Sequence, residues 1–403
     1  MEKITKLLSQ IKQRGLYPDV KVLQSACDTE VIINDKKVLM FGSYNYLGLA
    51  NHPKIKECAI KAIEKYGVAS GGVRLISGTM DIHQMMEKEL ALFTHYEDAL
   101  TTGTGFGTNT GLIPAIINLL GSKVKISLFT KDDVILSDEL NHASIIDGCR
   151  LSKAKVITYS HNDVDDLKSK LVKYKKRRKL IVTDGVFSMD GDIAPLDKIV
   201  ELAQRYKALT MVDDAHAIGV LGKTGGGTAQ YCGVEGKVDI NMGTMSKGLG
   251  CAGGFVSGGK ELIEYLRIAC RSYVFSDSMP PVIAASVVAV LGIIKNSPDI
   301  RDTLDQKATY FRNGMQEMGF DTLNSATQII PWLIGDEKKT IEVSKLLFEN
   351  GIFAPAVRWP AVPKKMARIR FNIMATHTRI QLNRLLSVCE QIGKRFKRDK
   401  RYV

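Results

Sequence analysis

Short apolar runs alternate with helical patterns of apolar and polar positions between about residues 50 and 290. Alternation of this kind predicts an α/β domain built on a largely parallel sheet. Such a sheet binds its ligands at the carboxyl ends of the strands, so we expect the chemistry there. The expected strands are 134–136, 155–158, 180–183, 209–212, 238–240 and 254–256, and the expected helices are 82–95, 164–174 and 196–207.

The pattern changes after Ser297 and Pro298, where longer helical stretches alternate with only a few apolar strands. This texture predicts a smaller C-terminal α+β domain with helices at 300–319 and 338–350, strands at 329–334 and 368–373, and a last helix from about 378. The first 40 residues contain a helical stretch and a short strand at 31–33, which indicates an arm. We therefore divide the chain into an N-terminal arm (1–50), a large domain (51–290) and a C-terminal small domain (291–403).

The composition is that of an ordinary globular protein, with 45% hydrophobic and 25% charged residues in 403. No apolar run approaches the roughly 20 residues that span a bilayer, and the N-terminus lacks the pattern of a secretory signal. The seven cysteines are scattered and form no CxxC pair, so we expect neither a metal site nor a disulfide framework. These features predict a reduced, cytoplasmic protein.

The net charge of +13 is concentrated in two basic stretches, Lys173–Lys179 (KYKKRRK) and Lys394–Arg401 (KRFKRDKR). One interpretation is a solvated loop and a solvated tail. The other is attraction to an acidic partner, such as coenzyme A phosphates, an acidic carrier protein, or an anionic membrane that the C-terminal tail contacts peripherally. Nucleic acid is disfavoured, because the basic runs are short and no nucleic-acid motif accompanies them.

Lys247 stands among small and hydroxyl residues in the segment Thr244–Gly250 (TMSKGLG). A lysine in such surroundings suits an amine that loses its proton and forms a Schiff base. Upstream, Asp213 ends the apolar run 209–212, where a carboxylate can keep a pyridine nitrogen protonated. Together the two residues predict pyridoxal 5′-phosphate (PLP), whose ring accepts the electrons released when a bond at an amino acid's Cα breaks.

A glycine-rich segment, Thr102–Asn109 (TGTGFGTN), precedes a helical run at 110–120. Glycines let backbone N–H groups approach a phosphate closely, and the helix N-terminus favours negative charge. The glycine spacing is not GxGxxG, which disfavours a nicotinamide dehydrogenase, and the Lys-Ser/Thr ending of a nucleotide P-loop is absent as well. Taken alone, the segment is equally well explained as a glycine-rich turn.

Further polar residues follow the strand runs. His142 can stack on a flat cofactor, and His216 and Ser188 can hydrogen-bond a phenolic oxygen, although a structural histidine and a turn serine fit these positions as well. Alternation places Arg368 and Arg370 on one strand face, where an arginine fork matches a substrate carboxylate. A surface strand with two solvated arginines has the same pattern.

From Asn34 to Leu386 the chain resembles the α-oxoamine synthases, which are fold-type I PLP enzymes. The matching segments occur in the family's order: Tyr44–Leu49 (YNYLGL), Gly71–Thr79 (GGVRLISGT), Asn141–Ser144 (NHAS), Asp184–Asp192 (DGVFSMDGD), Val212–Gly219 (VDDAHAIG), Thr244–Gly248 (TMSKG), Ser276–Pro281 (SDSMPP) and Arg368–Arg370 (RIR). The resemblance implies a large domain with a seven-stranded, mostly parallel sheet, a smaller C-terminal domain, and a homodimer.

The resemblance also implies a role for each matching residue. Lys247 would carry the cofactor as a Schiff base, Asp213 would pair with the pyridine nitrogen, and His142 would stack on the ring. His216 and Ser188 would contact the phenolic oxygen. The phosphate would be held by Gly105, Phe106 and Thr244, and by Ser276 or Ser278 of a neighbouring subunit. Substrate would be bound by Asn45, Arg370 and Arg74.

The implied activity is a decarboxylative condensation of an L-amino acid with an acyl thioester, which yields an α-amino ketone, CO₂ and a free thiol. Segments 137–152 and 374–378 look closest to serine palmitoyltransferase, so serine is the favoured amino acid. The alternatives are 8-amino-7-oxononanoate synthase, which uses alanine and a pimeloyl thioester, 2-amino-3-ketobutyrate CoA ligase and, outside the family, an aminotransferase. Two departures from the family pattern are Asp184, where glutamate is common, and Trp359, which replaces a proline near the substrate. The choice between acyl-CoA and an acyl-carrier protein stays open.

Overall fold

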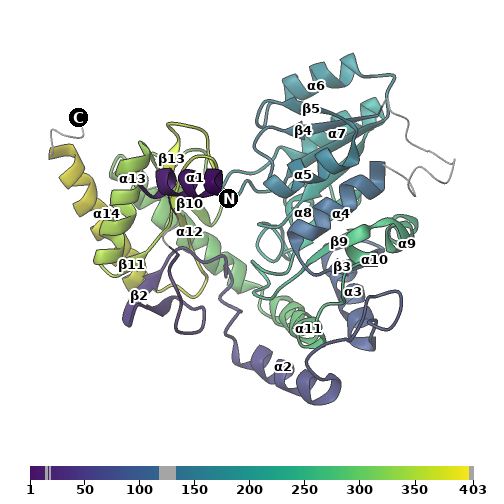
Figure 1. Ribbon diagram of the computed structural model, residues 1–403, viewed down its shortest axis with the longest axis horizontal. Coiled ribbons are helices and arrows are strands. Elements are labelled where there is room, and N and C mark those ends of the chain that lie inside the picture. Colours follow the sequence, from purple (N-terminus) through teal and green to yellow (C-terminus); the bar gives the residue numbers. More distant parts are fainter. Residues whose placement is uncertain (14–16, 18–19, 118–132, 399–403) are drawn as a thin grey trace.

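The computed structural model describes residues 1–13, 17, 20–117 and 133–398, with side chains up to residue 396, and it has two lobes (Figure 1). The C-terminal basic stretch Lys394–Arg401 therefore extends beyond the described residues. Residues 118–120 of the expected helix lie outside them as well. This helix is α4 (Gly105–Ile117), and it begins inside the glycine-rich segment.

The larger lobe contains a seven-stranded sheet in the order β3-β9-β8-β7-β6-β4-β5. Strand β9 runs antiparallel to both of its neighbours and the other pairs are parallel, which confirms the predicted largely parallel sheet. Strands β4 and β6 are buried along their whole length, as near-continuous apolar runs require. The bounds are β3 (Asp98–Thr102), β4 (Val134–Asp138), β5 (Lys155–Tyr159), β6 (Lys179–Asp184), β7 (Leu209–Asp213), β8 (Ile240–Thr244) and β9 (Gly254–Gly258).

One strand prediction is wrong in its position. Strand β8 begins at Ile240, whereas the apolar pattern placed a strand at 238–240. The residue before β8, Asp239, instead accepts hydrogen bonds from the backbone N and the Oγ1 of Thr210, at 2.7 and 2.8 Å. Its carboxylate thus fastens the turn before β8 to the start of β7. Strand β3, at one edge of this sheet, was not among the predicted strands.

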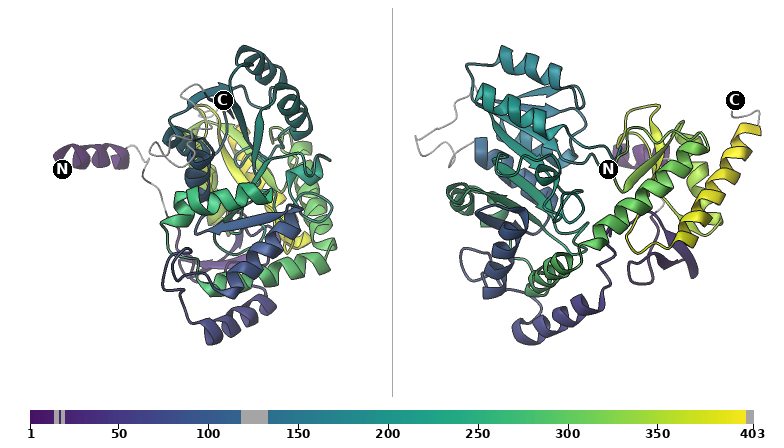
Figure 2. Two further views of the ribbon diagram at one scale, coloured as in Figure 1. Left: turned by 90° about the vertical axis from the view of Figure 1, so that its right-hand side faces the viewer. Right: turned by 180° about the vertical axis from the view of Figure 1, so that it is seen from behind.

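Helices cover both faces of this sheet (Figures 1 and 2). One buried cluster contains Ile113, Ile145 and Leu266, so α4, α5 and α9 cover one face. The other contains Leu171 and Ile199, so α6 and α7 cover the opposite face. The further bounds of this lobe are α2 (Pro53–Tyr66), α3 (Asp81–Thr94), α5 (Ala143–Ser152), α6 (Val164–Lys173), α7 (Leu196–Tyr206), α8 (Thr228–Tyr231), α9 (Lys260–Ala269), α10 (Arg271–Val274) and α11 (Pro281–Asn296).

The smaller lobe contains two three-stranded sheets, β10-β13-β12 and β1-β2-β11. The first is antiparallel, and in the second β2 pairs antiparallel with β1 and parallel with β11. The bounds are β1 (Glu30–Ile33), β2 (Lys36–Met40), β10 (Ile329–Gly335), β11 (Ile352–Phe353), β12 (Ala356–Val357), β13 (Ala367–Asn372), α12 (Asp299–Glu317), α13 (Glu337–Glu349) and α14 (Arg379–Arg398). These elements agree in type with the α+β pattern expected after residue 297.

The N-terminal segment is divided between two environments. Strands β1 and β2 join the smaller lobe, whereas α1 (Glu2–Gln13) buries none of its residues and projects from the body (Figure 2). The proposed boundary at residue 290 falls inside α11. The division into an arm and two domains remains a prediction. Among the described residues, no single helix is long and apolar enough to cross a membrane, and α11 with α12 meets that test only as a pair bent by 80°, on length and composition alone.

Candidate active site

A cavity of about 270 Å³ lies at the carboxyl ends of the central strands. It is lined by residues that follow β4, β6, β7 and β8 and by the first turn of α4, as the rule for parallel sheets predicts. A larger cavity of about 770 Å³, beside Tyr96 and Tyr265, has none of the predicted residues in its wall. The smaller cavity brings together most of the predicted residues: Gly105, Phe106, His142, Ser188, Asp213, His216, Thr244 and Lys247.

Lys247 enters this cavity three residues after β8 ends. Its Nζ lies 2.8 Å from Nε2 of His216. Burial lowers the pKa of Lys247 to about 8 and Arg370 adds to the effect, while Asp213 and Asp184 oppose it. A substantial fraction of the amine is therefore neutral at mildly alkaline pH, which is the form that attacks an aldehyde.

His216 connects Lys247 to Tyr46. The hydroxyl of Tyr46 lies 2.6 Å from Nδ1 of His216. Burial, together with the charges of Lys247 and Arg370, holds the pKa of His216 well below its usual value, so the imidazole is neutral. Burial raises the pKa of Tyr46, so its hydroxyl keeps its proton and donates it to Nδ1. Nε2 of His216 is then the donor that faces the Lys247 amine.

Asp213 ends β7 with its carboxylate fixed on both oxygens. Nδ2 of Asn109 donates to Oδ2 at 2.7 Å, and the backbone N of Ala215 donates to Oδ1 at 3.0 Å. The same Asn109 amide donates to Ser144 Oγ, which contacts Nδ1 of His142, at 2.8 and 2.7 Å. The orientation of the carboxylate and of His142 is thus set by one chain of hydrogen bonds.

A second carboxylate, Asp184, lies beside Asp213 in the register of β6 and β7. Burial raises the pKa of Asp184 well above its usual value, and the negative charge of Asp213 adds to the effect. Within the described part of the chain, Oδ1 of Asp184 is buried without a hydrogen-bond partner. The end of the cavity at Asp213 therefore favours a bound group that carries positive charge or a proton.

The opposite end of the cavity is built from the N-terminus of α4. The helix begins at Gly105, so its first backbone N–H groups have no partner inside the helix. A Cβ at Gly105 would lie 3.3 Å from Thr244, which shows how closely the two segments approach. Phe106 is half-exposed and presents its ring to His142, at 6.3 Å between centroids. This arrangement suits an anion such as a phosphate.

Two buried arginines lie side by side on β13, and the interpretation as a solvated surface strand is wrong for both. Arg368 is 1% exposed and donates to Asp190 Oδ1 at 2.7 Å. Arg370 is 2% exposed and lies over the ring of Tyr44, at 4.7 Å. Among the described residues, Nε and Nη2 of Arg370 find no hydrogen-bond acceptor. A buried guanidinium with two free N–H donors is complementary to a carboxylate.

Five of the predicted residues do not line the cavity: Arg370, whose charge nevertheless lowers the pKa of Lys247 and of His216, and four others. The Arg74 guanidinium makes a two-pronged ion pair with Glu87, at 2.7 and 2.9 Å, so its donors are engaged away from the site. Asn45 lies in a neighbouring cavity, where its side chain accepts from the backbone N of Ala50. Ser276 is exposed, and Ser278 is buried beside Gly78 with no partner for its hydroxyl within the described chain.

Comparison with known proteins identifies this arrangement. The family model described as aminotransferase class I and II matches residues 36–388. An 8-amino-7-oxononanoate synthase from Thermoanaerobacter pseudethanolicus is 47% identical over 97% of this chain and 96% of its own length. Another, from Petrotoga mobilis, is 48% identical over 98% of both chains. The chain belongs to the α-oxoamine synthases of this aminotransferase class I and II family.

Solved structures agree with this assignment. A serine palmitoyltransferase from S. paucimobilis, solved with a bound PLP–myriocin aldimine, superimposes with a TM-score of 0.90 at 30% identity, covering 98% of each chain. An 8-amino-7-oxononanoate synthase from Francisella tularensis gives a TM-score of 0.75 at 28% identity, covering 89% of this chain. The protein is therefore a PLP-dependent acyltransferase with the fold-type I architecture, as the sequence predicted. The names of its relatives favour the alternative, 8-amino-7-oxononanoate synthase, over the preferred serine palmitoyltransferase.

The cavity of this α-oxoamine synthase fits PLP. Its two ends match the two ends of the cofactor. The Asp213 carboxylate lies at one end, beside Oδ1 of Asp184, which has no hydrogen-bond partner among the described residues, and the N-terminus of α4 lies at the other. The predicted assignment gives Asp213 the ring nitrogen and Lys247 the aldehyde carbon. In the same assignment His142 would cover the ring, His216 and Ser188 would contact the phenolic oxygen, and Gly105, Phe106 and Thr244 would hold the phosphate.

The sequence did not single out some residues that the structure places in direct contact with this site. Asn109 and Ser144 orient Asp213 and His142, and Tyr46 orients His216. Tyr46 and Ser144 lie inside the segments YNYLGL and NHAS, so the signal was present without a role attached. Asn109 ends the glycine-rich segment TGTGFGTN, so it too lay in a recognised segment without a role attached.

Proposed function

We propose that this α-oxoamine synthase condenses L-alanine with a pimeloyl thioester and releases CO₂ and the free thiol, which is the reaction of an 8-amino-7-oxononanoate synthase. The observation that carries the proposal is the 44–48% identity, over nearly the whole chain, to relatives of that name. PLP supplies an electron-accepting ring that stabilises negative charge at the amino acid Cα.

The residues around the cofactor have separate tasks in this proposal. Arg370 binds the substrate carboxylate through its two free N–H groups, and Tyr44 stacks beneath it to hold the plane of the guanidinium. Lys247 would hold the cofactor and, once its amine is free, would be the base that takes the Cα proton. Its lowered pKa, about 8, leaves a substantial fraction of the amine neutral at mildly alkaline pH, and the neutral amine is the form that accepts a proton.

His216 and Asp213 support the same proton transfer from two sides. His216 is neutral, so it contributes a hydrogen bond to the cofactor's phenolic oxygen without adding a second positive charge beside Lys247. Asp213, anchored by Asn109, keeps the ring nitrogen protonated, which strengthens the ring as an electron acceptor. After the substrate Cα has attacked the thioester carbonyl and the thiol has left, Arg370 still holds the substrate carboxylate, which then leaves as CO₂.

We also propose that the enzyme is a homodimer in which Ser276 or Ser278 contacts the cofactor phosphate of the partner. Neither residue lines the cavity of its own chain. Exposed apolar side chains lie close to these serines. Phe275 directly precedes Ser276, and an isolated bridge from Asp277 to Val73 joins this segment to the one that carries the exposed Leu75 and Ile76. Light scattering of the purified protein tests the dimer, and a monomer with full activity would refute it.

A matrix of amino acids and acyl thioesters tests the substrate proposal. Thiol release is followed for alanine, serine and glycine, each with acetyl-, pimeloyl- and palmitoyl-CoA, and with pimeloyl-acyl-carrier protein. The proposal predicts that alanine with a pimeloyl thioester has the highest kcat/KM. Preference for serine with palmitoyl-CoA would instead favour serine palmitoyltransferase activity, which the TM-score of 0.90 keeps as the second candidate. Keto acid formed without thiol release would indicate an aminotransferase.

A further inference from the structure

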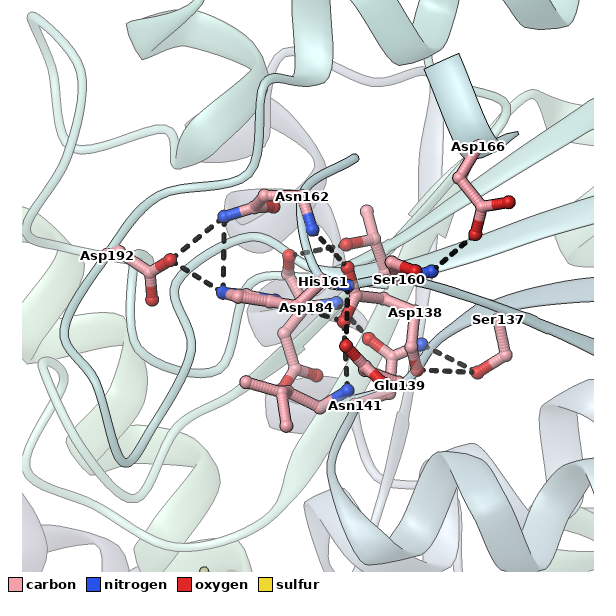
Figure 3. Close-up of polar contacts among 12 residues, drawn as sticks. Ser137, Asp138, Glu139, Asn141, Ser160, His161, Asn162, Asp166, Asp184 and Asp192 are labelled. Atoms are coloured by element: carbon pink, nitrogen blue, oxygen red, sulfur yellow. Dashed lines mark hydrogen bonds and ion pairs between the residues drawn. The ribbon is translucent and has the colours of Figure 1, made fainter. Parts of the chain in front are cut away.

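A histidine that follows the carboxyl end of β5 lies outside the cavity, between two carboxylates. One of the carboxylates, Asp138, ends β4. Figure 3 shows His161 with Asp138 on one side and Asp192 on the other. Nδ1 lies 3.1 Å from Asp138 Oδ1, and Nε2 lies 2.8 Å from Asp192 Oδ2. The side chain is 21% exposed, and neither of the two carboxylates belongs to the cofactor site.

The geometry fixes the protonation state of His161. Each ring nitrogen faces a carboxylate oxygen, and only the protonated ring can donate from both nitrogens. Burial alone lowers the pKa of His161, but the hydrogen bonds with Asp138 and Asp192 outweigh burial and raise the pKa to about 10. The imidazolium is therefore a fixed cation at neutral pH.

This cation contacts both ends of one short loop. The backbone N of Phe187 donates to the O of Asp192 at 3.1 Å, and the N of Gly191 donates to the O of Phe187 at 2.9 Å, so residues 187–192 close on themselves. His161 binds the Asp192 carboxylate at one end of the loop. At the other end its ring packs against the ring of Phe187, with centroids 4.3 Å apart at 85°. Ser188, in the cavity wall, directly follows Phe187.

The far side of the loop is held by the smaller lobe. Arg368 on β13 donates to the Asp190 carboxylate and to the backbone O of Met189, at 2.7 and 3.1 Å. Thr327 Oγ1 donates to the O of Gly191 at 2.9 Å. The loop is thus fixed between the His161 cation and the strand that carries Arg370, and Ser188 has little freedom to move within it.

We propose that His161 is a positioning residue that acts through Ser188: its two hydrogen bonds fix the loop 187–192 so that the Ser188 hydroxyl meets the cofactor's phenolic oxygen. The inference rests on the proposed cofactor contact of Ser188. It adds a residue that touches neither the cofactor nor the substrate.

A double-mutant cycle on the purified protein tests this inference. The variants are His161→Gln, Ser188→Ala and the double variant, and the readouts are the dissociation constant of PLP and the wavelength of its bound absorption band. His161→Gln keeps an amide that satisfies only one carboxylate, so we expect a loss of PLP affinity of about tenfold and a displaced band. In the Ser188→Ala background the same change should alter the affinity by less than about twofold. Additive effects in the two backgrounds would overturn the proposal.

Two further variants separate positioning from general stability. Leu347→Ala removes a buried side chain of α13, a residue outside the loop 187–192, and should lower the melting temperature. Per folded molecule, it should leave the PLP dissociation constant and the absorption band unchanged. Asp192→Ala removes the acceptor of His161 Nε2, leaves the His161–Asp138 pair in place and should reproduce the affinity loss of His161→Gln. An Asp192→Ala protein with unchanged affinity and band would contradict the proposal even if His161→Gln fails to fold.

These measurements do not depend on the substrates. If the wild-type enzyme binds PLP but forms no product from alanine and a pimeloyl thioester, the proposed function fails while the cycle remains interpretable. If product forms and the cycle is additive, the role of His161 fails alone.

Discussion

The two arginines of β13 provide a matched pair, because they are equally buried on one strand face and differ only in their partners. Arg368 has its guanidinium bound to Asp190 and to backbone oxygens, whereas Nε and Nη2 of Arg370 have no partner among the described residues. Replacement of each by methionine, which has a similar length and no charge, should therefore give opposite results in stability and in substrate binding.

For Arg368→Met we expect a large loss of stability. Breaking a buried ion pair costs about 3–5 kcal/mol when both partners are fully buried. Asp190 is 19% exposed, so we expect a loss somewhat below that range, about 2–3 kcal/mol. For Arg370→Met the enzyme without its amino acid substrate should lose less than about 1 kcal/mol, or gain stability, because a buried charge with unused donors is removed.

In catalysis with the amino acid substrate the order of the two variants reverses, and Arg370→Met should be the more impaired one. A hydrogen bond to a charged group contributes about 1.5–3 kcal/mol, so the loss of two from Arg370 costs about 3 kcal/mol or more. This corresponds to a decrease of about a hundredfold in kcat/KM for the amino acid. Urea unfolding of the PLP-bound enzymes and steady-state kinetics measure the two quantities. The reasoning is refuted if Arg370→Met is destabilised as strongly as Arg368→Met, or if its kcat/KM stays within about threefold of wild type.

Three further predictions concern single groups. Lys247→Ala should bind PLP without the absorption band of the wild-type enzyme and form no product; parental product formation would contradict its role. The rate at which the PLP-free enzyme binds PLP should rise with pH and level off above about 8, because only neutral Lys247 attacks the aldehyde. Stopped-flow absorbance measures this rate, and a rate that does not change with pH would contradict the lowered pKa of Lys247. The pKa of His161 is raised from 6.5 to about 10, so its stabilisation is complete below pH 6.5 and is lost as pH rises through 10. The stability difference between wild type and His161→Gln should shrink over that interval in urea titrations, and a difference that grows would be inconsistent with it.

The sequence predicted the parts of this protein that depend on local pattern. Buried strands such as β6 are continuous apolar runs, and the acids that end them, Asp184 and Asp213, mark the site because parallel strands end at one edge. The start of β8 was misplaced because Asp239 is used by Thr210, 29 residues earlier, and not by its own strand. Local apolarity carries no information about such a pairing.

The contacts that orient the site were beyond prediction for the same reason. Asn109 meets Asp213 across 104 residues, and Tyr46 meets His216 across 170. Whether an arginine on β13 is paired or free depends on a loop 178 residues away that supplies Asp190 to Arg368 and nothing to Arg370. The alternation of the strand shows that these two side chains share a face, but only the folded chain distinguishes their tasks.

The most direct test of the proposed reaction is its stoichiometry. Purified enzyme with PLP, L-alanine labelled in its carboxyl carbon, and pimeloyl-CoA is sampled for labelled CO₂ and for free thiol during the same time course. The account predicts that the two products appear at equal rates, and that neither appears when alanine or the thioester is left out. Thiol released without labelled CO₂, or labelled carbon recovered as pyruvate, would contradict a decarboxylative condensation.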